Sequence, residues 1–560
     1  MRMNKIASGA LALVAVHLAA SSAHATVVVS NAATQHMSCS AGVCTPTAQN
    51  AVLNAGDLQG MLASSDVKIV TGSIATEIHV IAPVTWASAN RLTLDARRSI
   101  AIRAAVVSQG TGGVTITTND GGSGGDLVFV SGGAISFWDN SSSLIVNGNA
   151  YTLASDIATL ASDIAAHPAG FHALAKDYDA TGDGTYRNVP VPTALTGTFE
   201  GLGHAIANLT IDAGKHANGS MGLFAQNDGT MRDVALTGAA ITCFSANQVG
   251  LLVGLNDGNL DAVSVAGQIG CTRGGYMGGL AGRSAIPAAI TNASANTAVS
   301  GVKFSYVGGL VGLNTGTIAG ASAAGTAGGN GLNMSAGGLV GSNDANDLIE
   351  DAHSSVTVNA PRGINVGGLI GVSSGGTIER CSATGNVTAK NVVGGIVGLF
   401  DDAGIIDSSF ATGTVTGSLF AGGIVGSGLA TTKIVNSYAT GAVTVTGANK
   451  SRVGGLAGTF DGDAIQTSWS SAAVTGGGRV GGVAGEIVSA TVTAGYWDLD
   501  TSGVSNPSQG AGNAANYPGL TGLTTTQFKS GLPSGFDPAI WGESAGINNG
   551  YPYLLANPPQ

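Results

Sequence analysis

Three aspartates in the segment DYDATGDG have the residue type and spacing of a calcium-binding loop. Asp177, Asp179 and Asp183 take positions one, three and seven of this segment. Calcium prefers several oxygen ligands, and short acidic loops can supply them. The segment lacks the bidentate glutamate that completes an EF-hand loop, so a solvated acidic turn is the simpler interpretation. Calcium is the one cofactor that the sequence suggests.

Signatures of enzymatic catalysis are missing from the sequence. It contains no HExxH metal motif, no G-x-S-x-G with plausible partners and no phosphate-binding loop with its lysine. His204 is the one histidine in a conspicuous motif, GLGHAIANL, and a turn or packing role suits it better than that of a catalytic base. The sequence therefore predicts a protein that is not an enzyme.

The elements that would position these residues follow from a glycine-bracketed hexapeptide that recurs through the second half of the chain. It reads VGGLVG at residues 307–312 and VGGIVG at 393–398, and ten equal or looser copies occur in all. Successive copies are 27 to 32 residues apart, and a fixed period of this length marks a repeat architecture. The central residues of the copies, used here as markers, are Leu223, Leu252, Leu280, Leu310, Leu339, Leu369, Ile396, Ile424, Leu456 and Val483.

The segments between the hexapeptides have the composition of strands and turns. They are short, β-branched and alternating, as in IVNSYATG at residues 434–441, and Gly, Asn and Asp separate them. No window of the repeats shows a sustained helical stripe of apolar residues. We therefore expect an all-β fold, a parallel β-helix of coils of about 29 residues that stack ~4.8 Å apart, with a capped C-terminal end.

The strands also place threonines where a binding face could form. In NVTAK, TVTGS and AVTVTG, strand alternation directs valine inward and Thr388, Thr416, Thr444 and Thr446 outward. A regular array of hydroxyls and methyls suits the binding of glycans, or of ice. The simpler interpretation is that threonine favours exposed strand positions.

An asparagine follows the marker residue by four positions in four of the repeats. Asn227, Asn256, Asn314 and Asn343 are expected at a corner of the coil, because asparagine tolerates the left-handed backbone conformation at little cost. Aligned asparagines on successive coils could also hydrogen-bond along the axis as a ladder. These residues are interpreted as turn residues without a catalytic role.

Cysteine usage fits an oxidising compartment. Cys243 and Cys271 each precede the next marker by nine positions, which places them at equivalent points of adjacent coils. The ~5 Å between such points lies within the Cα separation that a disulfide accepts, so we expect a Cys243–Cys271 bridge. Cys39 and Cys44 are close in sequence and could close a second, small loop, which leaves Cys381 as a buried filler.

The chain begins with a targeting signal and ends in a segment without repeats. Residues 1–25 have the basic start, apolar stretch and A-x-A ending of a signal peptide that is cleaved after Ala25. Trp541, Tyr551 and Tyr553 are expected to cover the last coil, because the ends of a solenoid must be covered. The expected segments after the signal peptide are a β-rich region (26–140), a connecting segment with a short helix (141–212), the repeats (213–497) and a Pro- and Gly-rich tail (498–560).

Composition excludes two classes of partner. The net charge is -11, which makes the chain a poor candidate for nucleic acid. Beyond the signal peptide no window holds ~18 consecutive apolar residues, so no transmembrane helix is expected in the mature chain.

The hexapeptide and the ATG-x-V units resemble the GLUG motif of bacterial surface proteins. This motif occurs in filamentous-haemagglutinin-like adhesins and in non-catalytic regions of some IgA-directed peptidases, and residues 91–122, 195–211 and 532–554 resemble segments that accompany it. The resemblance implies a right-handed β-helix, export to the cell surface or medium, and adhesion to glycans or matrix proteins of a host or neighbouring cell. The chain is short for such adhesins and shows no transporter domain, and a separate outer-membrane transporter could serve its export.

Two other classes of function stay open. A carbohydrate-active β-helix enzyme, such as a polysaccharide lyase or hydrolase, would need acids from adjacent coils to converge. Three or more carboxylates and an arginine in one lateral groove would favour that alternative. An ice-binding or matrix structural protein would need a flat, unbroken threonine face, which the variable repeat length does not favour.

Overall fold

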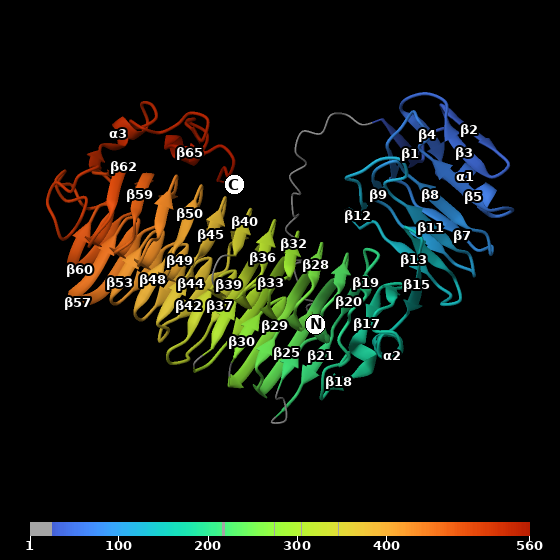
Figure 1. Cartoon of the computed structure of the whole chain (residues 1–560), viewed down its shortest axis with the longest axis horizontal. Coiled ribbons are helices and arrows are strands. Elements are labelled where there is room, and N and C mark those ends of the chain that lie inside the picture. Colours follow the sequence, from blue (N-terminus) through green and yellow to red (C-terminus); the bar gives the residue numbers. More distant parts are fainter. Residues whose placement is uncertain are drawn as a thin grey trace, which may run out of the picture. The chain divides into compact units, whose positions relative to one another are not determined.

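The computed structural model describes residues 25–130, 132–214, 219–273, 275–303, 305–344 and 347–559. The expected signal peptide lies outside the described residues except for Ala25. The described chain consists mainly of short strands, and it divides into two compact units (Figure 1). The first unit extends to residue 133 and includes 145–148, and the second contains 134–144 and the chain from residue 149 onward.

The first unit contains a stack of parallel strands. In one sheet, β1 (Thr26–Ser30) lies between β4 (Ala51–Asn54) and β6 (Glu77–Val80), and the sheet continues through β9 (Ile100–Ile102) and β12 (Leu127–Phe129). Alternate residues of β4 and β6 are buried, as expected for strands with one face on a core.

The first unit also contains a hairpin and a helix. β2 (Met37–Ser40) pairs in antiparallel fashion with β3 (Val43–Pro46). Helix α1 (Ala55–Leu62) begins at Asn54, whose side chain accepts hydrogen bonds from the first turn of the helix.

The second unit is a parallel β-solenoid, which confirms the expected fold class. One repeat supplies β26 (Gln248–Val249), β27 (Val253–Asn256), β28 (Asn259–Asp261) and β29 (Ser264–Arg273), and each pairs in parallel with the equivalent strand of the next coil. The chain makes about 17 turns in all. One sheet consists of β23 (Phe224–Asn227), β27, β31 (Ala281–Ser284), β35 (Val311–Asn314), β39 (Val340–Asp344), β44 (Ile370–Ser374), β49 (Val397–Phe400), β54 (Val425–Gly428), β58 (Ala457–Phe460) and β61 (Ala484–Ile487).

The hexapeptide forms a tight crease between two strands of each coil. Between β30 (Tyr276–Gly278) and β31 the chain bends at the marker Leu280, which is fully buried in the core. A Cβ added to Gly282 would lie 2.3 Å from the backbone nitrogen of Val249 in the preceding coil. Glycine is required here because β31 packs directly against the backbone of the preceding coil. The crease is the line between two series of strands. One series contains β26, β30 and their equivalents, and the other contains β27, β31 and the equivalents of those strands.

The asparagines form the expected ladder, but with a different backbone conformation. Asn227 Nδ2 donates to Asn256 Oδ1 at 2.7 Å, and Asn314 Nδ2 donates to Asn343 Oδ1 at 2.8 Å. All four residues are buried at the ends of extended strands, so the expected left-handed conformation is wrong for them. Left-handed residues instead occupy the corner after β24 (Thr230–Arg232), β28 and their equivalents: Asp233, Ala262, Asn292, Gly320, Asp351, Arg380, Ser408, Asn436, Thr467 and Ala494.

The end of the solenoid is covered by residues that follow the last repeat. The backbone N–H groups of residues 482–484 donate to the carbonyls of residues 509 and 510, so this segment pairs with the last coil. Trp497, fully buried, donates from Nε1 to the Val504 carbonyl at 3.0 Å. A cap is therefore present, but it is not built from the aromatic residues that we expected.

Those aromatic residues pack on a side of the coils. Phe410, Tyr438 and Trp469 stack on adjacent coils with ring centroids 5.0 Å apart, and Tyr551 stacks on Trp469 at 5.3 Å. The tail that carries Tyr551 follows α3 (Thr525–Phe528). It also supplies Trp541 and Tyr553, in β64 (Trp541–Gly542) and β65 (Tyr553–Leu554). The expectation that Trp541, Tyr551 and Tyr553 cover the last coil is wrong, because Trp541 and Tyr551 pack in an aromatic cluster on the side face, and Tyr553 lies on the strand that pairs with β64.

Candidate functional site

The structure does not bring the three loop aspartates together. Asp177 Oδ1 accepts from the Ala205 N–H at 2.9 Å, and Asp179 Oδ1 accepts from Thr181 and Asn208. Asp183 accepts from two tyrosine hydroxyls. No group of three potential metal ligands occurs among the described residues. The calcium loop expected at Asp177, Asp179 and Asp183 is therefore not supported, since protein donors already occupy these carboxylates.

His204 has the packing role that its motif suggests. Its side chain is buried, with Nδ1 3.2 Å from Asp177 Oδ1 and Nε2 2.9 Å from the Ile135 carbonyl. Hydrogen bonds to the loop lower the pKa of Asp177, first of all the one from His204. The histidine thus ties the 134–144 segment to the first coils of the second unit.

The predicted threonine face is a register-aligned ladder. Thr388, Thr416 and Thr444 pair on successive coils, and Thr475 extends the series by one coil. The flanking valines, such as Val415, are buried, whereas the threonines are half-buried or exposed. Thr446 is exposed, and its hydroxyl lies 3.3 Å from that of Ser418. Toward the N-terminus the ladder continues as Asn359 and Gly328, so the threonine series is confined to four coils.

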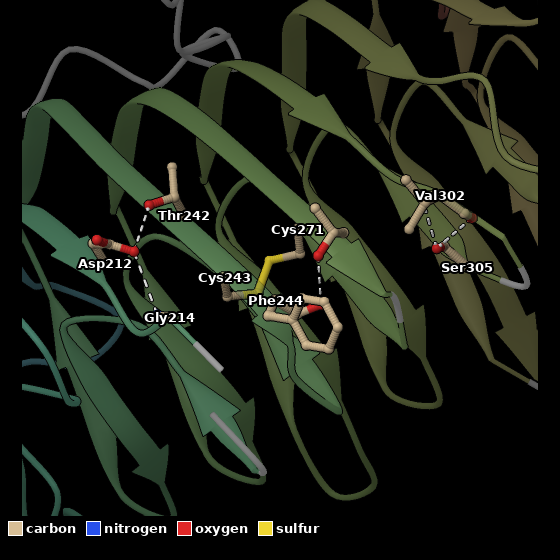
Figure 2. Close-up of a disulfide and its surroundings, with 9 residues drawn as sticks. Asp212, Gly214, Thr242, Cys243, Phe244, Cys271, Val302 and Ser305 are labelled. Carbon is tan, nitrogen blue, oxygen red and sulfur yellow. Dashed lines mark hydrogen bonds between the residues drawn. A yellow bond between two sulfur atoms is a disulfide. The ribbon is translucent and has the colours of Figure 1, made fainter. Parts of the chain in front are cut away.

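Both expected cysteine pairs are joined. Cys243 and Cys271 pair in register in β25 (Ala235–Ser245) and β29, with a Cα separation of 4.5 Å (Figure 2). Cys39 and Cys44 close the β2–β3 hairpin. Cys381 is free and buried, and burial raises the pKa of its thiol to about 12.

A buried carboxyl pair in the first coils has no counterpart in the sequence analysis. Glu200, in β19 (Thr198–Glu200), pairs in register with Arg232 of β24, and Arg232 Nε lies 3.5 Å from Glu200 and 3.0 Å from Asp233. Both acids are almost fully buried. Burial raises the pKa of Asp233 to about 6, and burial followed by the charge of Asp233 raises that of Glu200.

Arg380 gathers three further carboxylates at a left-handed corner. Its guanidinium donates to Asp351 at 2.7 and 3.0 Å, to Glu350 at 2.7 Å and to Glu379. The hydrogen bond to Asp351 is the largest cause of a raised pKa for Arg380. Carboxylates and an arginine do converge here, as a carbohydrate-active enzyme would need. All three acids nevertheless accept from the same guanidinium, so the arrangement fastens adjacent coils to each other.

The two sides of the crease carry outward side chains that face one another. The backbone of each β31-type strand lies against that of the coil before it, as Gly485 does against Val453. At this point Glu486 forms ion pairs with both Arg452 and Arg479. Further toward the N-terminus the same series contains Gln248, Tyr276 and Tyr306, which pair in register.

These groups could have been found from the repeat offset alone. Glu200 and Arg232 are separated by about one repeat, and so are Phe410, Tyr438 and Trp469. Residues at such separations lie on adjacent coils even when they stand outside the hexapeptide. The position of the tail on the side face had no such signal, because the tail is not part of a repeat.

Comparison with known proteins identifies the repeat. The model of the GLUG motif matches residues 363–388, which contain the hexapeptide VGGLIG and β44. One repeat of the chain therefore matches the GLUG motif. The motif thus coincides with the crease and with the strands that follow it.

Two known proteins are similar to parts of this chain. Halomucin of Haloquadratum walsbyi (strain DSM 16790 / HBSQ001) is 32% identical over 161 residues, which cover 28% of this chain and 2% of halomucin. The chain therefore spans a small fraction of that relative's length. The crystal structure of a Bacteroides ovatus protein assigned as an immunoglobulin A1 protease aligns over 73% of this chain and 92% of its own, with 16% identity and a TM-score of 0.28.

The described residues include no helix that is both long and apolar enough to cross a membrane.

Proposed function

We propose that this chain is an exported, non-enzymatic repeat protein whose solenoid displays regular side faces that bind glycans or matrix proteins outside the cell. The observation that carries the proposal is the ladder of Thr388, Thr416, Thr444 and Thr475. It places identical hydroxyl and methyl groups one coil apart on an outer face. A polymer whose units repeat at a regular distance could contact several of these threonines at once.

Several features support an extracellular location. Two disulfides suit an oxidising compartment, and residues 1–25 have the pattern of a cleaved signal peptide. The GLUG motif and the similarity to part of halomucin fit a surface or secreted repeat protein. The resemblance to filamentous-haemagglutinin-like adhesins supports retention at a bacterial surface through a separate transporter.

An enzyme acting on polysaccharides is the second candidate, because of the carboxyl pair Glu200 and Asp233. A carboxylic acid that keeps its proton near neutral pH is a potential general acid. Both side chains are, however, at most 5% exposed, which leaves a sugar chain little access to them. The geometry thus favours binding over hydrolysis.

The test is retention of the mature chain, residues 26–560, on an array of glycans and matrix proteins. We expect selective binding that persists in chelator, and weaker binding when Thr388, Thr416 and Thr444 are replaced together by valine, which removes the hydroxyls and keeps the shape. A matched control replaces Thr85 and Thr93 of the first unit, which are also half-buried. Shortened glycans on the array would instead establish the enzyme, and ice-recrystallisation inhibition without glycan binding would establish the ice-binding alternative.

A further inference from the structure

One stretch of the solenoid is positively charged within an acidic chain. Residues 262–343 contain no aspartate or glutamate, and their charged residues are Arg273, Arg283 and Lys303. The chain as a whole has a net charge of -11. These residues span nearly three coil lengths, and the repeat that carries Arg273 also contains Asp257 and Asp261.

Two of these cations lie at equivalent points of adjacent coils. Gly270 pairs with Ser300 and Tyr276 pairs with Tyr306, so the residues midway between them, Arg273 and Lys303, share the same offset. Both are exposed. Like charges on neighbouring strands repel each other, and an anion between them would relieve that repulsion. The Arg273 guanidinium lies over the Phe244 ring, 5.4 Å from its centroid.

The third cation lies on the opposite side of the crease. The Cβ position of Gly282 is 2.6 Å from the Gln248 carbonyl carbon, so the strand that carries Arg283 lies directly against the strand that carries Gln248 in the preceding coil. At the other end of the crease the same relation pairs Arg452 with Glu486. The Nε of Arg283 is buried and has no hydrogen-bond partner among the described residues. Gln248 is neutral and forms no such ion pair with Arg283, whose charge acts instead on Asp257 of the preceding repeat.

Two tyrosines lie between these cations. Tyr276 and Tyr306 stack on adjacent coils with centroids 5.5 Å apart and planes inclined by 29°, and both are half-buried. Partly exposed tyrosines supply an apolar surface together with a hydroxyl group, a combination that suits contact with a sugar ring. Guanidinium groups suit carboxylates and sulfates, which they bind through paired hydrogen bonds.

We propose that Arg273, Tyr276, Arg283, Lys303 and Tyr306 form a binding site for an anionic polysaccharide, one whose sugar units carry carboxylate or sulfate groups. The proposal rests on the proposed function and assigns a ligand class and a place to it. The Cys243–Cys271 bridge, two residues before Arg273, covalently joins the coils beside the site (Figure 2). The bridge fixes the spacing between adjacent coils, and so it preorganises the site for a polyanion with regularly spaced charges.

The experiment measures binding of residues 26–560 to immobilised polygalacturonate, dextran sulfate and neutral dextran. We expect the polyanions to be retained in a salt-dependent manner, and the carboxylate and sulfate arms to show which group is preferred. The variant Arg273→Gln/Arg283→Gln/Lys303→Gln should bind about tenfold or more weakly, because charge-assisted hydrogen bonds are lost. The control Arg103→Gln/Lys176→Gln/Arg362→Gln removes the same charge from exposed positions elsewhere and should bind like the wild type.

An equal loss in both triple variants would overturn the site, since net charge alone would then explain binding. Far-UV circular dichroism and the melting temperature establish that each variant is folded. Wild-type binding to neutral glycans or matrix proteins, with no retention on the polyanions, would refute this inference and leave the proposed function intact. Absence of binding to every ligand would refute both.

Discussion

Replacing Asp233 by asparagine should remove a pH dependence from the stability of the second unit. Burial raises the pKa of Asp233 from 3.8 to about 6. Because the folded chain holds this proton more tightly than the unfolded chain, the stabilisation is fully present below about pH 4 and is lost as the pH rises through 6. A shift of roughly two units corresponds to a loss of about 3 kcal/mol in the free energy of unfolding.

The asparagine side chain reproduces the protonated state of Asp233 closely. It keeps an oxygen that can accept from Arg232 Nε, which lies 3.0 Å from Asp233. Position 233 has a φ of 55°, and asparagine tolerates this left-handed conformation well. Asp233→Asn therefore removes the titration with little change in packing.

The assay is urea unfolding of the wild type and of Asp233→Asn at a series of pH values from about 4 to 9. Relative to the wild type, the variant should gain about 3 kcal/mol between pH 4 and 8. Groups that titrate equally in both proteins cancel in this difference. The Asp120→Asn substitution removes a carboxylate from an exposed position and serves as a control. A difference between Asp233→Asn and the wild type that stays constant with pH would refute the reasoning.

Three further predictions concern the disulfide, the crease and the acidic loop. Cys243→Ser/Cys271→Ser should lower the free energy of unfolding by about 3.5 kcal/mol, as expected for a bridge with a sequence separation of 28. Dithiothreitol should then no longer change the melting temperature of this unit. An unaltered urea midpoint would contradict this prediction. Gly312→Ala should lower the free energy of unfolding by about 3 kcal/mol or prevent folding, because its Cβ would lie 2.3 Å from the Met277 nitrogen. Gly270→Ala should be tolerated, because nothing lies within 4 Å of the added Cβ. Equal thermal stability of the two variants would show that the crease can open. EDTA should leave the melting temperature unchanged, because protein donors occupy Asp177, Asp179 and Asp183; a calcium-dependent rise in melting temperature would restore the metal loop.

The repeat period was sufficient to predict the solenoid, because residues one period apart lie on adjacent coils. The same rule placed Cys243 opposite Cys271 and aligned Thr388 with Thr416. It also predicted the asparagine ladder, for which the offset between Asn227 and Asn256 is enough.

Backbone conformation and tertiary docking were outside the reach of that rule. Asparagine is common in left-handed turns, but burial of Asn256 at the end of a strand overrides this tendency, since its side chain satisfies the ladder. The pair Glu200 and Asp233 was not predicted, because isolated acids in a sequence are usually interpreted as solvated residues at turns. The contact of Tyr551 with Trp469 joins segments without a shared period, and no local pattern encodes it.

The folded-back tail determines how the solenoid would carry mechanical load. Asn557 Nδ2 donates to the carbonyls of Cys381 and Ser408, which lie several coils before the last one. Tyr551 is stacked on Trp469, which lies between these carbonyls and the last coil. A pull at the C-terminal end would therefore act first on these contacts, across several coils in parallel. Without the tail, the same pull would peel the terminal coil from its neighbour one hydrogen bond at a time. In a protein held between two surfaces, these tail contacts would be loaded together in shear, instead of breaking one after another. The force needed to unfold the chain would therefore be higher.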